Sequence, residues 1–478
     1  MYYSLRNSLN NLSRARLTSK VFSIPSKTCR FQRVRGGYSY TKRENCNTPS
    51  SKERQFTCQK ETVFRSFSLS RLNYLLQEST IPNQLISRND STISSSITYT
   101  RPIVGYWLLG TAALVFGIVI LGGLTRLTES GLSIVEWKPI TGVLLPITEQ
   151  QWEEEFERYK QFPEYKKLNT EMSLHDFKFI YLMEWAHRMW GRAIGVSFIL
   201  PAVYFGARGY MTRSASYKVI GLAGLLGFQG FLGWYMVKSG LSEELMDNPG
   251  AVPRVSHYRL VAHLGSAFLL YIGMLLTGLQ ILRDAKIAKG TFPVSISKAL
   301  LNPAINVFRR SAIGTATLIF LTSLSGALVA GLDAGLIYNE FPYMGKNIVP
   351  PHNELFSKVY TRPGDVFAWR NFFDNPTTVQ FDHRVMAMTT LGVVIALWIY
   401  SRRVPITMNA RRASNILLGV AGMQATLGIS TLIYMVPIPL ASAHQAGSLT
   451  LLTSALWLVH LMRRIPPLIV KSSVLKKL

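Results

Sequence analysis

The sequence predicts an all-α membrane protein with eight transmembrane helices, arranged as two pseudo-symmetric four-helix bundles. Three observations predict this fold class: long apolar runs, basic connections on one side of them, and an internal repeat. Of the 478 residues, 48% are hydrophobic and 16% are charged, and the mean hydropathy is +0.17. This composition is typical of a chain that crosses a membrane several times rather than of a water-soluble domain.

The N-terminal region, residues 1–95, differs in composition from the rest of the chain. It is rich in Arg, Lys, Ser, Thr and Asn, poor in acidic residues, and lacks the apolar segment of a secretory signal. These features are typical of a mitochondrial transit segment with disordered chain; a disordered basic tail is the alternative. All three cysteines, Cys29, Cys46 and Cys58, lie here. Removal of the segment would leave no thiol for a disulfide, a zinc site or thioether-attached haem.

Eight apolar runs follow Arg101, and each is close to the roughly 20 residues that a helix needs to cross a bilayer. The runs cover residues 103–124, 177–205, 216–238, 257–282, 310–331, 383–400, 412–435 and 442–462. Basic residues follow the second, fourth, sixth and eighth runs, whereas the other connections are acidic or mixed. The positive-inside rule then predicts a multi-pass protein of the mitochondrial inner membrane with both termini in the matrix. Targeting and topology explain the net charge of +26, so the expected partner is membrane lipid and not nucleic acid.

The runs divide into two similar halves, predicted as an N-terminal bundle over residues 96–300 and a C-terminal bundle over residues 301–478. Matching residues form four groups, and within each group the offset between the halves is constant. A longer connection before His263 changes the offset of the last group. Gly122, Glu129, Gly131, Leu132, Glu136 and Trp137 match Gly326, Asp333, Gly335, Leu336, Glu340 and Phe341; His187-Arg188 matches His383-Arg384; Gln229 and Gly233 match Gln424 and Gly428; and Ala262-His263 matches Ala443-His444. Both halves begin on the same side, so they are parallel repeats about an axis along the membrane normal.

Four histidines occupy repeat-related positions on the second and fourth helices of the halves. His187 and His263 belong to the first half, and His383 and His444 to the second. Two imidazoles that face each other across a bundle core can ligate haem iron from both sides. A single intramembrane histidine more often serves a hydrogen bond between helices, but the repetition favours ligands. Zinc is disfavoured because structural zinc takes four nitrogen or sulfur ligands.

The residue one helical turn after each histidine is small, as a flat porphyrin would require. These residues are Gly191, Ala267, Ala387 and Ser448. Small residues also let membrane helices approach one another, which is the alternative explanation.

Glu184 distinguishes the two halves. It precedes His187 by three residues, whereas the neutral Gln380 precedes His383. A carboxyl group in a poorly solvated site can exchange protons with a bound substrate, and an amide cannot. The first half is therefore predicted to be catalytic and the second half to carry electrons.

Alternative roles for the charged residues stay open. Glu184 is also placed to form an ion pair with Arg188 or Arg192, which lie within two helical turns. Arg188, Arg384 and Arg259 are also candidates to pair with haem propionates.

Five motifs carry a resemblance to a known family. They are GGLTRLTESGLSIVEWKPITG at 122–142, EWAHRMWGR at 184–192, HYRLVAH at 257–263, FDHR at 381–384 and AHQ at 443–445. Together they resemble the haem A synthases of mitochondria, the Cox15/CtaA family, over about 103–463, the whole predicted membrane domain.

The resemblance implies an enzyme that oxidises the C8 methyl group of haem O to the formyl group of haem A, for cytochrome c oxidase. It implies that His383 and His444 hold a permanent haem b (protohaem), while His187 and His263 face the substrate haem and Glu184 acts as acid or base. It also implies electrons from a matrix ferredoxin and ferredoxin reductase, and contacts with haem O synthase and cytochrome c oxidase assembly factors. The outer cysteine pair of some bacterial members is absent from this sequence.

Two other functions compete with a haem A synthase. One is a b-type bis-histidine cytochrome that only transfers electrons across the membrane, and the other is a non-enzymatic haem-handling assembly factor. The difference between Glu184 and Gln380 favours the enzyme, because a pure electron relay has no evident use for a single intramembrane acid. The sequence does not decide between a monomer and a homo-oligomer.

Overall fold

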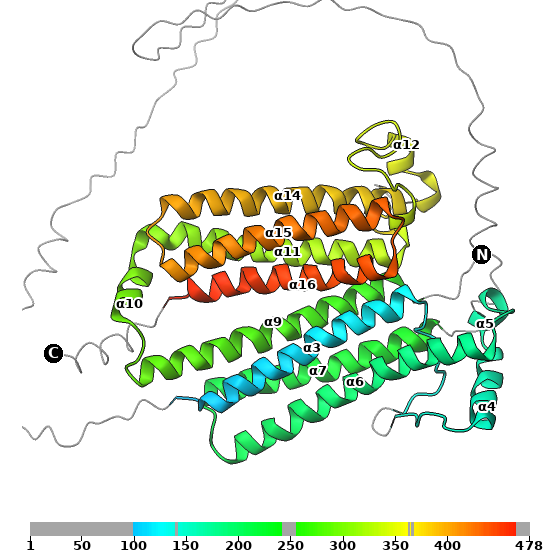
Figure 1. Cartoon of the computed structure of the whole chain (residues 1–478), viewed down its shortest axis with the longest axis horizontal. Coiled ribbons are helices and arrows are strands. Elements are labelled where there is room, and N and C mark those ends of the chain that lie inside the picture. Colours follow the sequence, from blue (N-terminus) through cyan, green and yellow to red (C-terminus); the bar gives the residue numbers. More distant parts are fainter. Residues whose placement is uncertain (1–98, 139–141, 241–254, 362–363, 365–367, 465–478) are drawn as a thin grey trace, which may run out of the picture. The chain divides into compact units, whose positions relative to one another are not determined.

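The computed structural model describes residues 99–138, 142–240, 255–361, 364 and 368–464. The predicted transit segment and its cysteines lie outside the described residues. The described chain contains helices and no β-strand, as predicted (Figure 1).

Eight long helices coincide with the eight apolar runs. They are α3 Pro102–Leu127, α6 Leu174–Ala207, α7 Arg213–Gly240, α9 His257–Ala288, α11 Asn306–Gly331, α14 Pro376–Arg403, α15 Met408–Ile433 and α16 Ile438–Leu461. The largest boundary difference is at α14, which begins seven residues before the run predicted from residue 383. Its start is set by local chemistry rather than by hydropathy, because the Asn375 side chain accepts a hydrogen bond from the Thr377 N–H and Pro376 occupies the first turn.

Seven of the described helices are long and apolar enough to cross a membrane. The eighth predicted span, α16, has 24 residues and contains no Asp, Glu, Lys or Arg, so its length and charge are suitable. Its polar residues His444, Gln445 and His460 instead reduce its hydropathy. The candidate ligand His444 is therefore also one of the residues that lower the hydropathy of α16.

The long helices pack in the order of the repeat (Figure 1). In the first half, α3 contacts α6 and α9, and α7 contacts the same two helices. In the second half, α11 and α15 each contact α14 and α16. The halves meet where α9 packs against α11 and α16 packs against α3. One apolar core spans both halves and includes Leu108, Phe268, Phe308 and Leu449.

The repeat is also visible in the backbone directly after the first helix of each half. Glu129 has φ = 53° and its equivalent Asp333 has φ = 51°. Left-handed backbone is uncommon for residues other than glycine. Two such residues at equivalent positions show that the chain leaves α3 and α11 by the same turn.

The connections after these turns differ between the halves. The first contains α4 Glu149–Lys160 and α5 Pro163–Leu168, which pack on the start of α6 through a small core of Trp152, Phe156, Tyr159, Phe177 and Tyr181. The second contains only short helices, η2 Ala334–Leu336, α12 His352–Leu355, η3 Lys358–Tyr360 and α13 Asn371–Asp374. Helix α10 Val294–Leu301 and η1 Pro303–Ile305 join the halves. The structural difference between the halves is thus concentrated at the ends of the helices that carry the histidines.

Candidate haem sites

Each of the four candidate histidines lies opposite a glycine on a neighbouring helix of its own half. The relevant distance is from the ring Cε1 atom to the position that a Cβ atom would take on the glycine. It is 2.9 Å for His187 and Gly122, 3.4 Å for His263 and Gly233, 3.0 Å for His383 and Gly326, and 2.7 Å for His444 and Gly428. A Cβ atom at Gly122 or Gly428 would lie under 3.0 Å from the ring, so the ring would have to move, and at Gly326 the contact would be unusually tight.

The rings also have a consistent pattern of burial. The four histidines are only partly buried. The Nδ1 atoms of His187, His263 and His444 are buried and have no hydrogen-bond partner. The accessible side of these rings therefore carries Nε2, a nitrogen through which an imidazole binds a metal. His383 differs, because its Nδ1 lies 2.8 Å from Ser325 Oγ, a contact that fixes the ring orientation.

The histidines pair within halves. His187 and His263 are near enough for their charges to interact, and so are His383 and His444. Among the described residues, no group of three or more His, Cys, Asp or Glu side chains lies close enough to hold a metal ion. Two protein ligands per half, each beside a glycine, fit a flat group that takes one ligand from each side, as bis-histidine haem does.

Two glutamines support the backbone at the histidines of α9 and α16. Gln229 Nε2 donates to the His263 carbonyl at 3.0 Å, and Gln424 Nε2 donates to the His444 carbonyl at 2.9 Å. The halves then diverge. Ser266 Oγ donates to Gln229 Oε1 at 2.5 Å, whereas Gln424 Oε1 is buried without a partner and a Cβ atom on the equivalent Gly447 would overlap it.

Sequence reasoning missed the role of these glutamines and of the four glycines. Gln229, Gln424 and the two glycine pairs were all visible as repeat matches. The repetition of polar and glycine positions within membrane helices was the available signal. This repetition does not show which residues on adjacent helices face each other.

Glu184 is fully engaged by neighbouring groups. Its Oε2 accepts hydrogen bonds from Ser133 Oγ at 2.7 Å and from the Ile134 N–H at 2.8 Å. Its Oε1 accepts two hydrogen bonds from Arg188, the shorter one 2.7 Å long. The ion pair with Arg188 is therefore present, whereas Arg192 donates to the Lys138 carbonyl. These contacts fix the carboxylate between the connection that follows α3 and the helix that carries His187.

The second half repeats this clamp without the acid. Arg384 donates to the Tyr338 carbonyl at 2.9 Å, as Arg188 donates to the equivalent Ile134 carbonyl at 2.8 Å. Gln380 donates to the same Tyr338 carbonyl, and its own Oε1 is buried without a partner. Arg188 and Arg384 thus bind the connections that follow α3 and α11. Only in the first half does the arginine also pair with a carboxylate, that of Glu184.

The three arginines considered for haem propionates are placed differently. Arg188 directs its donors to Glu184 and to loop carbonyls, and Arg384 donates to two loop carbonyls. Arg259 stacks over the Tyr235 ring with 4.6 Å to the ring centroid and makes one long hydrogen bond of 3.5 Å to its hydroxyl. Within the described part of the chain, Arg259 therefore makes fewer and longer hydrogen bonds than the other two arginines, which favours it for an anionic partner.

A second buried acid lies in the connection between α3 and α6. Glu164 is 5% exposed, and its carboxyl accepts a hydrogen bond of 2.9 Å from the Tyr159 hydroxyl. Burial raises the pKa of Glu164 to about 8, and the negative charge of Glu184 acts in the same direction, against the opposing effect of the Tyr159 hydrogen bond. Glu164 does not stand out in the sequence, because it lies in the polar segment that forms the short helix α5.

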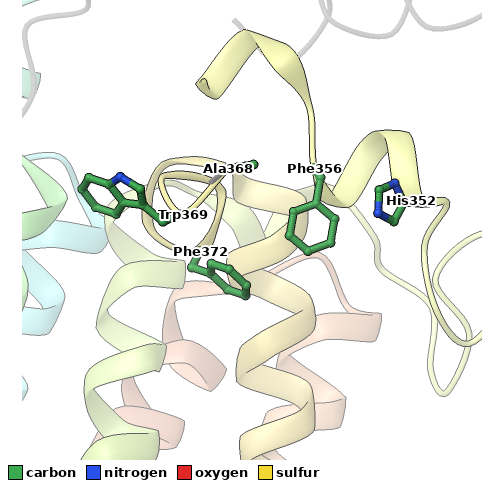
Figure 2. A pocket seen from close by; sticks show the side chains of 5 residues that line it. All are labelled: His352, Phe356, Ala368, Trp369 and Phe372. Atoms are coloured by element: carbon green, nitrogen blue, oxygen red, sulfur yellow. The ribbon is translucent and has the colours of Figure 1, made fainter. Parts of the chain in front are cut away.

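A pocket of about 470 Å³ lies apart from the histidine pairs, in the connection between α11 and α14 (Figure 2). It is lined by His352, Phe356, Ala368, Trp369 and Phe372. None of the four candidate ligands lines it, so it is not the site that the repeat defines.

Comparison with known proteins gives consistent matches over the helical region. The family model of the cytochrome oxidase assembly protein COX15-CtaA matches residues 105–456. Heme A synthase COX15 of Saccharomyces cerevisiae is 48% identical over 418 residues, which cover 86% of this chain and 84% of the relative. Heme A synthase COX15 of Homo sapiens is 48% identical over 390 residues, 82% of this chain and 90% of the relative. A heme A synthase-mitochondrial ferredoxin fusion protein of Schizosaccharomyces pombe is 49% identical over 367 residues, 75% of this chain and 59% of the relative.

Proposed function

This chain belongs to the COX15-CtaA family of cytochrome oxidase assembly proteins, and we propose that it is a haem A synthase, which oxidises haem O to haem A. It is a multi-pass membrane protein. One structural observation carries the proposal: two repeat-related histidine pairs lie within the matched region, and each of their rings faces a glycine. In the proposed reaction one haem is the substrate and a second haem delivers electrons, and the repeat provides a histidine pair for each.

In the proposed division of labour, His383 and His444 hold a permanent haem b. A haem bound there would supply reversible one-electron chemistry that side chains cannot provide. The contact between Ser325 and His383 supports this assignment, because a fixed ring orientation suits a permanently bound group. Gln424 supports the backbone of His444 in the same way.

The first half would bind haem O between His187 and His263 and oxidise its C8 methyl group to a formyl group. Glu184 is the proposed acid or base. Its carboxylate is held beside His187 by four hydrogen bonds, so it stays in position without reorganising during the reaction. Arg188 neutralises the buried carboxylate in the resting site. Arg259 is the best placed of the three arginines to bind a propionate.

The proposed topology has eight membrane spans in two four-helix bundles, with both termini in the matrix of the mitochondrion. The contacts of α16 with α15, α11 and α3 support its place as the eighth span despite its lower hydropathy. A transit segment within residues 1–95 would direct the chain to the inner membrane. The basic connections after α6, α9 and α14 support the matrix orientation.

The proposed electron source is a matrix ferredoxin with its reductase. The relative from Schizosaccharomyces pombe, in which a heme A synthase and a mitochondrial ferredoxin form one chain, supports this partner. Haem O synthase and cytochrome c oxidase assembly factors are proposed as the source of substrate and the recipients of product.

Haem extraction from the purified protein tests the proposal. Haem b together with haem O or haem A is the expected result. Haem b at both sites, with neither haem O nor haem A, would instead identify an electron-transfer cytochrome. A single haem site that is never reduced by ferredoxin would identify a haem carrier.

A further inference from the structure

The side chain of Gln445 connects the two halves directly beside a candidate ligand. Gln445 follows His444 in α16, and its Nε2 donates to the Val119 carbonyl of α3 at 2.7 Å. A helical carbonyl oxygen already accepts one backbone N–H, and its second lone pair is available for such a bond. An amide side chain in an apolar helix is costly unless it is paired, so this bond gives Gln445 a defined position.

The surface of α3 is shaped to accept this amide. A Cβ atom on Gly123 would overlap Gln445 Oε1, so a side chain at residue 123 is incompatible with the contact. The preceding residue, Gly122, faces His187 from a direction about 100° around α3. A continuous row of contacts therefore runs from His444 through Gln445 and the two glycines to His187, that is, from one candidate haem site to the other.

The repeat shows that packing alone does not require this arrangement. At the equivalent contact between the halves, α9 packs against α11. There Leu264 takes the place of Gln445, and Ala327 takes the place of Gly123. At the equivalent positions of the α9–α11 contact, the chain thus has an apolar side chain and an alanine. The polar bond is present only where the helix of His444 meets the helix that faces His187.

We propose that Gln445 is a positioning residue that fixes the second-half histidine pair relative to the first-half pair and thereby sets the rate of electron transfer between the haems bound there. The inference rests on the proposed function, because it requires a haem in each half. The electron enters from the ferredoxin, and no bond is made or broken at Gln445. Electron tunnelling decreases steeply with separation, so a looser contact between α16 and α3 slows transfer without removing a ligand.

The test uses full-length protein purified with its haems. Gln445→Met keeps the length of the side chain but removes the hydrogen-bond donor, and Gln445→Leu copies the residue of the first half. After rapid reduction of the second-half haem, we expect the rate of electron transfer to the first-half haem to fall at least fivefold in both variants. We expect haem b content and the thermal unfolding midpoint to match the wild type. Leu264→Met, at the equivalent position, is the control and should leave the rate unchanged.

Gly123→Ala gives an independent measurement, because its methyl group occupies the place of the Gln445 amide. The transfer rate should fall in Gly123→Ala. When Gly123→Ala is added to Gln445→Ala, the rate should fall no further than in Gln445→Ala alone. A wild-type rate in Gln445→Met, additive effects of the two alanine changes, or loss of haem b from the Gln445 variants would each overturn the role of Gln445. Failure of the proposed function is distinguishable, since the wild-type protein would then lack haem b or form no haem A.

Discussion

The Glu184 carboxylate and the Arg188 guanidinium form an ion pair of 2.7 Å one turn apart in α6, with side chains that are 3% and 9% exposed. His187 lies between them in the sequence and faces Gly122. Breaking a buried ion pair by removing one partner usually costs about 3–5 kcal/mol, because a charge is left uncompensated. The second half shows how the protein tolerates an arginine here without this acid: Arg384 donates to two loop carbonyls, as Arg188 does, and to no carboxylate among the described residues.

Replacement of the acid is therefore a usable test of its role. Glu184→Gln recreates the arrangement of Gln380 beside Arg384, so we expect the fold and haem content to be retained. Haem A formation should fall by at least about 100-fold, because an amide cannot exchange a proton with the substrate. The measurement is the ratio of haem A to haem O in purified protein. Ser133→Ala is the control: it removes one hydrogen bond to Glu184 but keeps the carboxylate, and it should retain most haem A. Wild-type haem A formation by Glu184→Gln would rule out the catalytic role.

Substitutions in the two histidine pairs should affect different haems. Changing His383 or His444 to alanine should abolish the haem b absorption spectrum, because each removes one of the two axial ligands. Changing His187 or His263 should leave that spectrum in place and stop haem A formation. Absorption spectra and haem extraction of the four variants check this division. A haem b spectrum that survives the loss of His444 would show that the assignment of the halves is wrong.

The glycines beside the histidines should be sensitive to a single methyl group. Gly428→Ala would place a Cβ atom 2.7 Å from His444 Cε1, so we expect displacement of the ring and loss of haem b by at least about tenfold in affinity. Gly422 is the matched control on the same helix, because a Cβ atom there meets nothing within 4 Å. Gly422→Ala should keep haem b and add about 0.5–1 kcal/mol of helix stability. Equal haem b retention in the two variants would contradict the role of Gly428.

The connection that contains α4 and α5 should lose stability as the pH rises. Burial raises the pKa of Glu164 to about 8, from an ordinary value of 4.5. The folded state then holds a proton that the unfolded chain releases, so this contribution is complete below about pH 4.5 and is lost as the pH approaches 8. We expect amide exchange in α4 and α5, corrected for its intrinsic rate, to accelerate over this range by an equivalent of on the order of 3 kcal/mol.

Glu164→Gln should make that protection independent of pH, because the amide has no proton to lose. Glu157→Gln is the control on α4, where the side chain is exposed and pairs with Lys160. Equal pH dependence in wild type and Glu164→Gln would exclude Glu164 as its source.

The sequence by itself determined the helices and the candidate ligands. Apolar runs of membrane length fold as helices, because in an apolar environment each backbone group must be paired within its own segment. The internal repeat then identified His187, His263, His383 and His444 without reference to their distances. It also isolated Glu184, since a comparison of the halves needs only the alignment of one with the other.

Only the tertiary structure decided which residues meet. The glycine opposite each histidine, the hydrogen bonds of Glu184 with Ser133 and Ile134, and the bond from Gln445 to Val119 all join different helices or connections. Their partners are 16 to more than 300 positions apart in the sequence, and helix packing sets their separation rather than local propensity. The burial of Glu164 has the same origin, since a polar segment becomes enclosed only when α4 and α5 fold against α6.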